Sequence, residues 1–406
     1  MNVLFLSLLS FDTLDEENIY TDLLKEFSNR GDNVYVVSPI ERRFKKSTYI
    51  IEEKNVKILR LKIGNIQKTN IIEKGISTVI LEYQIIKGIK KYFNNIKFDL
   101  ILYSTPPITF YKAIKYIKNR DKAISYLMLK DIFPQNAVDI GILSQSGIKS
   151  IIYKYFRKKE KQLYYISDYI GCMSEANVKY IIQHNKELNE NKIEICPNSI
   201  NVKDKSIDEN IRKQIREKYS IPYNKKIFIY GGNLGRPQGI DFIIECLEYE
   251  KDNNDIFFII VGDGTEFKKI FQYINNHNLN NVKLMNKVPK DEYDKLVAAS
   301  DIGLIFLDYR FTIPNFPSRL LNYMQAKLPV IAATDLNSDI GIEIEKGKFG
   351  WSCNSNNVVD FDKCIQKALK NQLDREDEWK YLEENFSTSK CYKIIKEKVK
   401  NENIND

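Results

Sequence analysis

Three glycine-bearing or helix-opening segments in the second half of the chain have the composition of an anion site. The first, Tyr230–Ile240, follows a β-prone run and reads Tyr-Gly-Gly-Asn-Leu-Gly-Arg-Pro-Gln-Gly-Ile. The second is Val261-Gly-Asp-Gly264, and the third, Asn315–Met324, opens another helix. Backbone N–H groups at such strand-to-helix turns can close on a phosphate, and glycine lets the main chain approach because it has no Cβ. The spacing therefore predicts one anionic ligand at several strand ends.

Length and composition are those of a two-domain globular protein. The 406 residues, of which 43% are hydrophobic and 12% aromatic, suffice for two cores and exclude disorder. No apolar run approaches the length that crosses a bilayer, and Met1–Leu9 lacks the basic leader and cleavage site of a secretory signal. Six scattered cysteines and two histidines favour neither a zinc site nor a disulfide framework. We expect a reduced, cytoplasmic setting.

Short β-rich runs alternate with amphipathic stretches, which predicts doubly wound α/β sheets with ligands at the carboxyl ends of the strands. The pattern restarts after a polar stretch over 201–219, and predicts an N-terminal domain over 1–199 and a C-terminal domain over 200–384. A helical pattern over 379–399 predicts a C-terminal helix, at about 385–404, that packs back on the first domain. The predicted strands lie near Asn2–Leu9, Val34–Val37, Val56–Arg60, Leu100–Tyr103, Ala123–Leu129, Tyr169–Met173, Ile193–Cys196, Ile227–Tyr230, Ile256–Val261, Val282–Met285, Ile302–Leu307 and Val330–Ala333.

These motifs carry a resemblance to a known family. Gly231–Gly239, Val261–Gly264 and Phe316–Val330 resemble segments of bacterial glycosyltransferases of family four, which have two Rossmann-like domains in the GT-B arrangement. In the first half, Asp131–Leu143 is similar to a stretch in members that build capsule, O-antigen or exopolysaccharide repeat units. The resemblance covers nearly the whole chain, and its specific part is the C-terminal half.

The resemblance implies transfer of a sugar from a nucleotide diphosphate sugar, with UDP as the expected nucleotide, to a lipid-linked saccharide. It further implies retention at the anomeric carbon, with no metal ion and no cofactor. Amide donors, a helix N-terminus and Arg would stabilise the charge that builds on the departing diphosphate. The donor-binding residues implied are Gly231, Gly232, Asn233, Gly235, Arg236, Gln238, Gly262, Asp263, Gly264, Pro317, Ser318, Arg319, Leu320 and Asn322.

The chain also departs from the family pattern. Asn233 and Gln238 stand where many members have a phosphate-binding Arg and Lys, with Arg236 between them. The family's paired glutamates fall on Pro314 and Asn322, so no carboxylate is available there for the ribose hydroxyls. This leaves open a non-catalytic partner subunit. Another alternative is a GT-B nucleotide-sugar 2-epimerase, which the scarcity of histidine disfavours.

Asp131, just after a predicted strand, is the candidate catalytic residue, orienting the acceptor hydroxyl or sharing its proton. The alternative is an N-cap for a helix through 136–138. The turns have structural alternatives too: Pro317 and Ser318 could simply start a helix. Arg319 distinguishes these interpretations, because a structural cap needs no cation beside a positive helix end.

The segment 148–165 predicts a basic amphipathic helix. Its apolar residues recur at helical spacing, and only Glu160 offsets its basic ones. The alternatives are an ordinary surface helix packed on the sheet or contact with an anionic membrane surface; no nucleic-acid module is recognisable. We expect a cytoplasmic enzyme peripherally associated with the inner face of the membrane. The membrane-surface candidates are Lys149, Lys154, Arg157, Lys158, Lys159 and Lys161.

Overall fold

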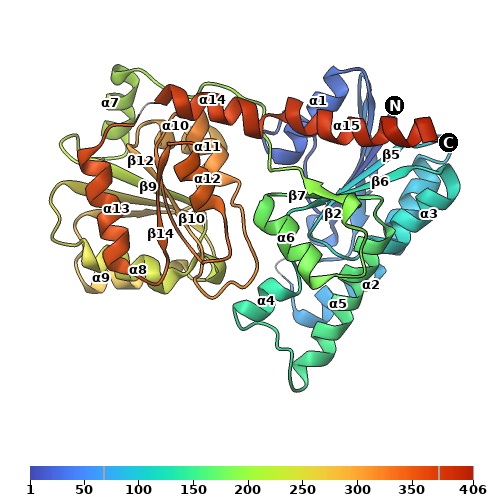
Figure 1. Cartoon of the computed structure of the whole chain (residues 1–406), viewed down its shortest axis with the longest axis horizontal. Coiled ribbons are helices and arrows are strands. Elements are labelled where there is room, and N and C mark those ends of the chain that lie inside the picture. The colour runs from blue at the N-terminus through green and yellow to red at the C-terminus, as the bar shows by residue number, and fades with distance from the viewer. Residues whose placement is uncertain (67–68, 374, 406) are drawn as a thin grey trace. The chain divides into compact units, whose positions relative to one another are not determined.

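The computed structural model describes residues 1–66, 69–373 and 375–405. It consists of two units, one formed by Met1–Asn201 with Thr388–Asp406 and the other by Val202–Ser387 (Figure 1). Each unit is a mainly parallel sheet with helices on both faces, as the alternating sequence pattern predicts. No helix within the described ranges is both long and apolar enough to cross a membrane.

The first unit has an eight-stranded sheet in the order β3-β4-β2-β1-β5-β6-β7-β8. Among the described strands of this sheet, β3 alone pairs antiparallel, with β4; the other neighbouring strands are parallel. Its elements are β1 (Asn2–Leu6), α1 (Ile19–Asn29), β2 (Asn33–Glu41), the 3-10 helix η1 (Arg42–Phe44), β3 (Tyr49–Glu53), β4 (Val56–Ile63), α2 (Ile71–Tyr92), β5 (Leu100–Ser104), α3 (Tyr111–Asp121), β6 (Ile124–Leu129), α4 (Gln135–Asp139), α5 (Lys149–Ile166), β7 (Tyr169–Cys172), α6 (Glu175–His184), η2 (Glu190–Lys192), β8 (Ile193–Ile195) and α15 (Thr388–Asn405).

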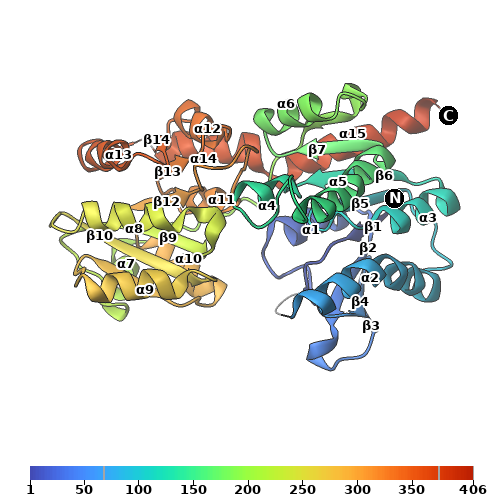
Figure 2. The same ribbon diagram turned by 90° about the horizontal axis from the view of Figure 1, so that it is seen from below.

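Helices cover both faces of this sheet, so its central strands are apolar on both sides. On one face α1 and α15 pack together, and Phe27, Cys391 and Ile395 join Val3 and Phe5 in one buried cluster. Helices α2 and α3 lie together elsewhere on the unit, as Figure 2 shows from below. The residues of α15 therefore belong to the core of the first unit, although they follow the whole second unit in sequence.

The second unit has a six-stranded parallel sheet in the order β11-β10-β9-β12-β13-β14. Helices α8 and α13 pack on one face, where Phe242 and Phe361 meet Phe228 and Phe306. Its elements are α7 (Glu209–Lys218), β9 (Lys226–Asn233), η3 (Arg236–Gln238), α8 (Ile240–Tyr249), β10 (Ile256–Asp263), α9 (Phe267–Asn276), β11 (Val282–Met285), α10 (Lys290–Ala298), β12 (Ile302–Phe306), α11 (Arg319–Gln325), β13 (Val330–Thr334), α12 (Ile340–Lys346), β14 (Gly350–Asn354), α13 (Val358–Lys370) and α14 (Arg375–Phe386).

The predicted strands are present in the structure with shifted ends, and two further strands occur. The edge strands β3 and β14 were not predicted from the sequence. The single helical pattern over 379–399 is two helices, α14 and α15, which end and begin on either side of Ser387.

Candidate functional site

Two of the glycine-bearing turns lie side by side at the carboxyl end of the second unit's sheet. Strands β9 and β10 pair so that Gly231 faces Val261 and Gly232 faces Gly262. Beyond the strands, the Leu234 N–H donates to the Asp263 carbonyl at 2.8 Å. Backbone hydrogen bonds therefore hold the two turns side by side.

Glycine is required at two of these positions by close packing. A Cβ on Gly262 would lie 1.9 Å from the carbonyl oxygen of Gly232, which is backbone and cannot rotate away. A Cβ on Gly231 would lie 2.1 Å from the hydroxyl of Tyr293, a residue of α10. The glycines therefore serve the tight approach of β9 to β10 and to α10, independently of any ligand.

Arg319, the first residue of α11, lies against the first turn. Its guanidinium carbon is 4.3 Å from the centre of the Tyr230 ring, and its Nη2 is 3.3 Å from where a Cβ on Gly232 would be. The Nη1 atom is buried and has no hydrogen-bond partner among the described residues. Nor does any ion pair within the described ranges join Arg319 to a carboxylate. A buried guanidinium nitrogen with unused donors is costly by itself, so the arrangement favours an anion beside the glycine turn.

Tyrosines surround this arginine. The Tyr323 hydroxyl donates to the carbonyls of Ile229 and Leu304, at 3.2 and 3.1 Å, which fixes α11 to the sheet. The Tyr293 hydroxyl is buried, and no hydrogen bond satisfies it within the described part of the chain. Sequence reasoning missed Tyr293, because it lies in an ordinary amphipathic helix with no motif around it. Tyr230 was visible only as the start of the glycine segment.

The other residues around α11 have varied surroundings. Ser318 precedes the helix, but its side chain makes no capping hydrogen bond, so the purely structural interpretation lacks its expected contact. Leu320 is fully buried in the core, so only its backbone is available to a ligand. Pro317 and Asn322 are half-buried and Pro314 is buried. No carboxylate replaces the family's glutamates at Pro314 and Asn322.

The polar residues of the first turn contact one another or a neighbour. The side-chain amides of Asn233 and Gln238 lie 3.0 Å apart, so each uses part of its hydrogen-bonding capacity on the other. Arg236 is 59% exposed and lies 3.8 Å from a carboxylate oxygen of Glu266. This exposed pair leaves Arg319 as the cation that the structure holds against Gly232, with Gly235, Asp263 and Gly264 completing the two turns.

In the first unit, Asp131 follows β6 after one intervening lysine. Both carboxylate oxygens accept from the Asn136 amide, at 2.7 and 2.8 Å, and the backbone N–H donates to the Thr105 hydroxyl at 3.2 Å. Helix α4 has Pro134 at its N-cap, so Asp131 is not the capping residue. Burial raises the pKa of Asp131 to about 6, and the Asn136 hydrogen bonds offset only part of this. The structure therefore holds a carboxyl whose pKa is raised toward neutral pH.

We expect kcat/KM to rise with pH through about 6, the pKa of Asp131, because the ionised carboxylate accepts a stronger, charge-assisted hydrogen bond from an acceptor hydroxyl than the protonated carboxyl does. Asp131→Asn should remove this step and lower kcat/KM by about tenfold or more. A pH–rate profile of both proteins checks this.

The folded-state pKa lies above the ordinary 3.8, so this group stabilises the fold most at low pH and loses that effect as pH rises through 6. Protonation of Asp131 would therefore not unfold the protein in acid. If kcat/KM of Asp131→Asn falls at low pH in the same way as that of the parent, Asp131 is not the group that sets the pH dependence.

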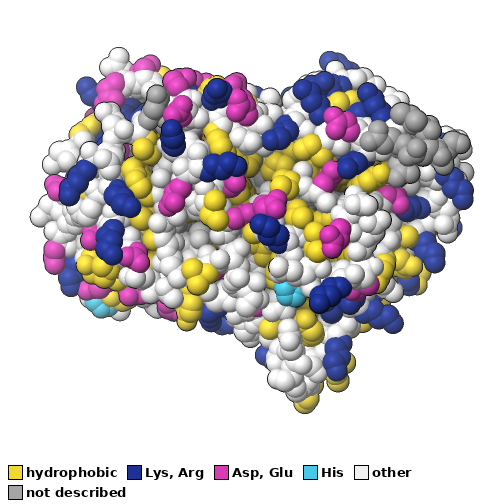
Figure 3. Space-filling view, viewed as in Figure 1, with side chains coloured by type: hydrophobic (Ala, Val, Ile, Leu, Met, Phe, Trp, Pro, Cys, Tyr) yellow, Lys and Arg dark blue, Asp and Glu magenta, His cyan; other side chains and the backbone are white. Residues whose placement is uncertain are grey.

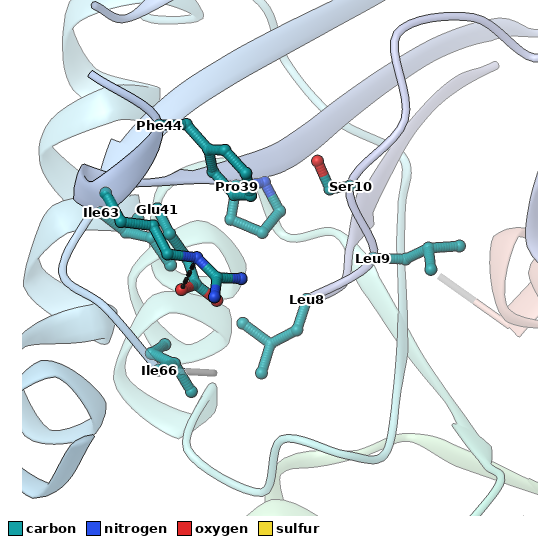
Figure 4. A pocket seen from close by; sticks show the side chains of 9 residues that line it. Leu8, Leu9, Ser10, Pro39, Glu41, Phe44, Ile63 and Ile66 are labelled. Atoms are coloured by element: carbon teal, nitrogen blue, oxygen red, sulfur yellow. Dashed lines mark ion pairs between the residues drawn. The ribbon is translucent and has the colours of Figure 1, made fainter. Parts of the chain in front are cut away.

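A cavity of about 240 Å³ lies at the carboxyl ends of β1, β2 and β4 in the same unit. Figure 4 shows its mainly apolar lining and an ion pair on one of its walls, in which Arg43 lies 3.1 Å from Glu41. Sequence reasoning missed this cavity, since its residues come from loops without a motif. The lining residues are Leu8, Leu9, Ser10, Pro39, Glu41, Arg43, Phe44, Ile63 and Ile66.

The basic residues of α5 divide into two groups. Arg157, Lys159 and Lys161 form ion pairs with Glu160, Glu82 and Glu187 respectively. Lys149, Lys154 and Lys158 are exposed, and no ion pair engages them among the described residues. The helix thus offers fewer unpaired cations than its sequence indicates.

Comparisons with known proteins agree with this geometry. Residues 211–385, almost the whole second unit, match the family model described as glycosyl transferases group 1. The probable glycosyltransferase WbjE of Pseudomonas aeruginosa is 23% identical over 283 residues, which are 68% of this chain and 67% of that protein.

Solved structures show the same fold. Sucrose-phosphate synthase from Thermosynechococcus elongatus superposes with a TM-score of 0.78 at 13% identity, covering 100% of both chains. Anabaena HepE in complex with UDP-glucose gives a TM-score of 0.69 at 16% identity, covering 99% of this chain and 100% of that one. The fold is GT-B, with two doubly wound α/β units, as expected from the motifs.

Proposed function

We propose, from the premise that this chain is a glycosyltransferase, that it binds a UDP-sugar at the glycine turns of its second unit and transfers the sugar to an acceptor held by the first. The observation that carries the donor site is the placement of Arg319, whose guanidinium stacks on Tyr230 beside Gly232 and has unused donors. HepE, a structural neighbour, has been solved with UDP-glucose. A diphosphate supplies the anion that this arginine lacks.

The chemistry follows from where charge develops. As the glycosidic bond breaks, the departing UDP gains negative charge on its terminal phosphate. Backbone N–H groups of the two turns and the Arg319 guanidinium would stabilise that charge, in place of a divalent cation. We propose that the anomeric configuration is retained, with the leaving phosphate oxygen accepting the proton of the attacking hydroxyl and Asp131 orienting that hydroxyl. One bond forms as another breaks: the acceptor oxygen replaces the phosphate oxygen at the anomeric carbon.

The acceptor proposal rests on the first unit. Strand ends in a parallel sheet lie along one edge, so Asp131 after β6 and the cavity beside β1 share that edge. The cavity's walls are mainly aliphatic and aromatic, which favours an acceptor with an apolar portion over a free, fully hydroxylated sugar. A lipid-linked saccharide of surface-polysaccharide assembly, presented at the inner face of the membrane, is the acceptor class we propose.

We expect UDP or UDP-glucose to raise the melting temperature without added magnesium, and EDTA to leave the shift unchanged. Ligand at a hundred times its Kd stabilises by about 2.7 kcal/mol, and for a unit of this size that is about 5–10 °C. Tryptophan fluorescence measures the second unit alone, because both tryptophans, Trp351 and Trp379, lie in it. A shift that appears only with a divalent cation would contradict the metal-independent site, and absence of turnover with every UDP-sugar would favour a non-catalytic subunit.

A further inference from the structure

Helices α2 and α5 of the first unit each expose an apolar stripe at i, i+3, i+4 and i+7 spacing. On α2 the stripe is Ile76, Val79, Ile80 and Tyr83, with Ile76 59% and Tyr83 57% exposed. On α5 it is Ile151, Ile152 and Tyr155, preceded by Ile148 at the N-cap, with Ile148 87% and Ile151 70% exposed. Large aliphatic residues with this spacing normally face a core, so both stripes lack the partner that their pattern predicts.

The two stripes belong to one face because α3 packs against both helices. The Lys112 ammonium of α3 donates to the Tyr83 hydroxyl at 2.7 Å, at the end of the α2 stripe. The Lys159 ammonium of α5 lies 5.9 Å from the centre of the Tyr155 ring, at the end of the α5 stripe. Lys159 of α5 also lies 3.7 Å from Glu82 of α2. Lys159 therefore links the Tyr155 end of the α5 stripe to α2, beside the Tyr83 end of the α2 stripe.

Unpaired cations border this face. Lys149, Lys154 and Lys158 of α5 are exposed, and so is Lys87 of α2. No ion pair holds any of these four within the described ranges. In Figure 3, Lys and Arg side chains alternate with hydrophobic ones over the region of α5. An apolar face bordered by unpaired lysines is complementary to an anionic bilayer surface, whose headgroups attract the cations while its acyl region accepts the apolar residues.

We propose that the stripes of α2 and α5 together dock this chain on an anionic lipid bilayer by inserting into the boundary between headgroups and acyl chains. This inference rests on the proposed function, which places the acceptor at the membrane, and deepens it. It adds α2 to the membrane contact and requires insertion of apolar side chains in addition to electrostatic adsorption of the lysines. The contact lies on the first unit, while donor binding belongs to the second.

The test uses vesicles of equimolar phosphatidylcholine and phosphatidylglycerol and measures co-sedimentation of the full chain in low and high salt. High salt screens the charge of the lysines but not the apolar contact. The fraction of protein bound to the vesicles should therefore fall as salt rises, but a salt-resistant part should remain bound. The paired substitutions Ile76→Ser with Val79→Ser, and Ile148→Ser with Ile151→Ser, should each lower the salt-resistant partition coefficient by about tenfold or more. Leu336→Ser with Ile342→Ser, at residues 86% and 67% exposed in the second unit, is the matched control and should change nothing.

Three results would overturn the proposal. One is loss of all parent binding in high salt, because only adsorption would then operate. Another is vesicle binding of the Ile76→Ser with Val79→Ser variant that equals that of the parent protein. The third is a dimer of the parent protein that the same substitutions dissociate, since a second copy would then cover the stripes. The UDP-induced melting shift of each variant is read in parallel: if the shift is absent in the parent, the donor proposal fails while the vesicle result still stands.

Discussion

We expect Arg319→Ala to lower kcat/KM by about 10- to 150-fold, because the charge-assisted hydrogen bond that it removes contributes about 1.5–3 kcal/mol. The reason is its position: the guanidinium lies over Tyr230 and beside Gly232, with Nη1 unpartnered. Arg319→Lys should recover part of the loss, since it restores the charge but not the two-pronged geometry. Steady-state kinetics with a UDP-sugar measure both variants, and tryptophan fluorescence checks that the second unit is folded.

The matched control for this prediction is Arg236→Ala. Arg236 is largely exposed, so solvent screens any contact that it makes with the diphosphate; such exposed charge contacts contribute at most about 1 kcal/mol, and kcat/KM should fall by about fivefold at most. The double variant tests whether both arginines contact one diphosphate, in which case their effects do not add. If Arg319→Ala turns over like the parent, Arg319 has only a structural role and the donor site is misplaced.

Gly262→Ala is expected to destabilise the second unit by about 3 kcal/mol, the upper end of the usual cost of overpacking. The new Cβ would lie 1.9 Å from the Gly232 carbonyl oxygen, so β9 and β10 must separate at the point where both turns begin. Urea unfolding followed by tryptophan fluorescence measures the change, because Trp351 and Trp379 are both in this unit. The rise in melting temperature that UDP induces should also be absent in Gly262→Ala.

Two controls isolate the steric cause. Asp263→Ala, at the exposed neighbouring position, adds no backbone clash and should leave the urea midpoint nearly unchanged. Gly75→Ala in α2 has open space around its Cβ and lies in the other unit, so it should not alter the tryptophan signal. A Gly262→Ala protein with the parent's midpoint would mean that the two strands separate at no cost, contrary to the packing described.

The fold was predictable where burial makes a strand uniformly apolar. Strands such as β5, Leu-Ile-Leu-Tyr-Ser, are buried on both faces and stand out from their surroundings. The edge strands β3 and β14 carry Glu, Ser and Asn and are half-buried or exposed, so neither alternation nor a continuous apolar run marks them. Their pairing is decided by the neighbouring strand, which local sequence does not record.

The site was predictable in its backbone and less so in its side chains. Glycine segments mark close approach of the main chain, so the turns at Gly231 and Gly262 could be located. The contact of Tyr293 with Gly231 joins residues about sixty positions apart and leaves no local signal. On α5, charge counting included Arg157, Lys159 and Lys161, which the fold pairs with buried or distant glutamates.

The placement of α15 has a consequence for the order of folding during synthesis. Cys391, Tyr392 and Ile395 belong to the same buried cluster as Val3 and Phe27, yet the 186 residues of the second unit are made in between. At the usual translation rate of about 5–20 residues per second, roughly 10–40 s pass between completion of the first unit's strands and the arrival of its last helix. The second unit emerges whole and can fold at once. The first unit lacks α15 until that helix is made, so the core of the domain whose strands are synthesised earlier is completed later.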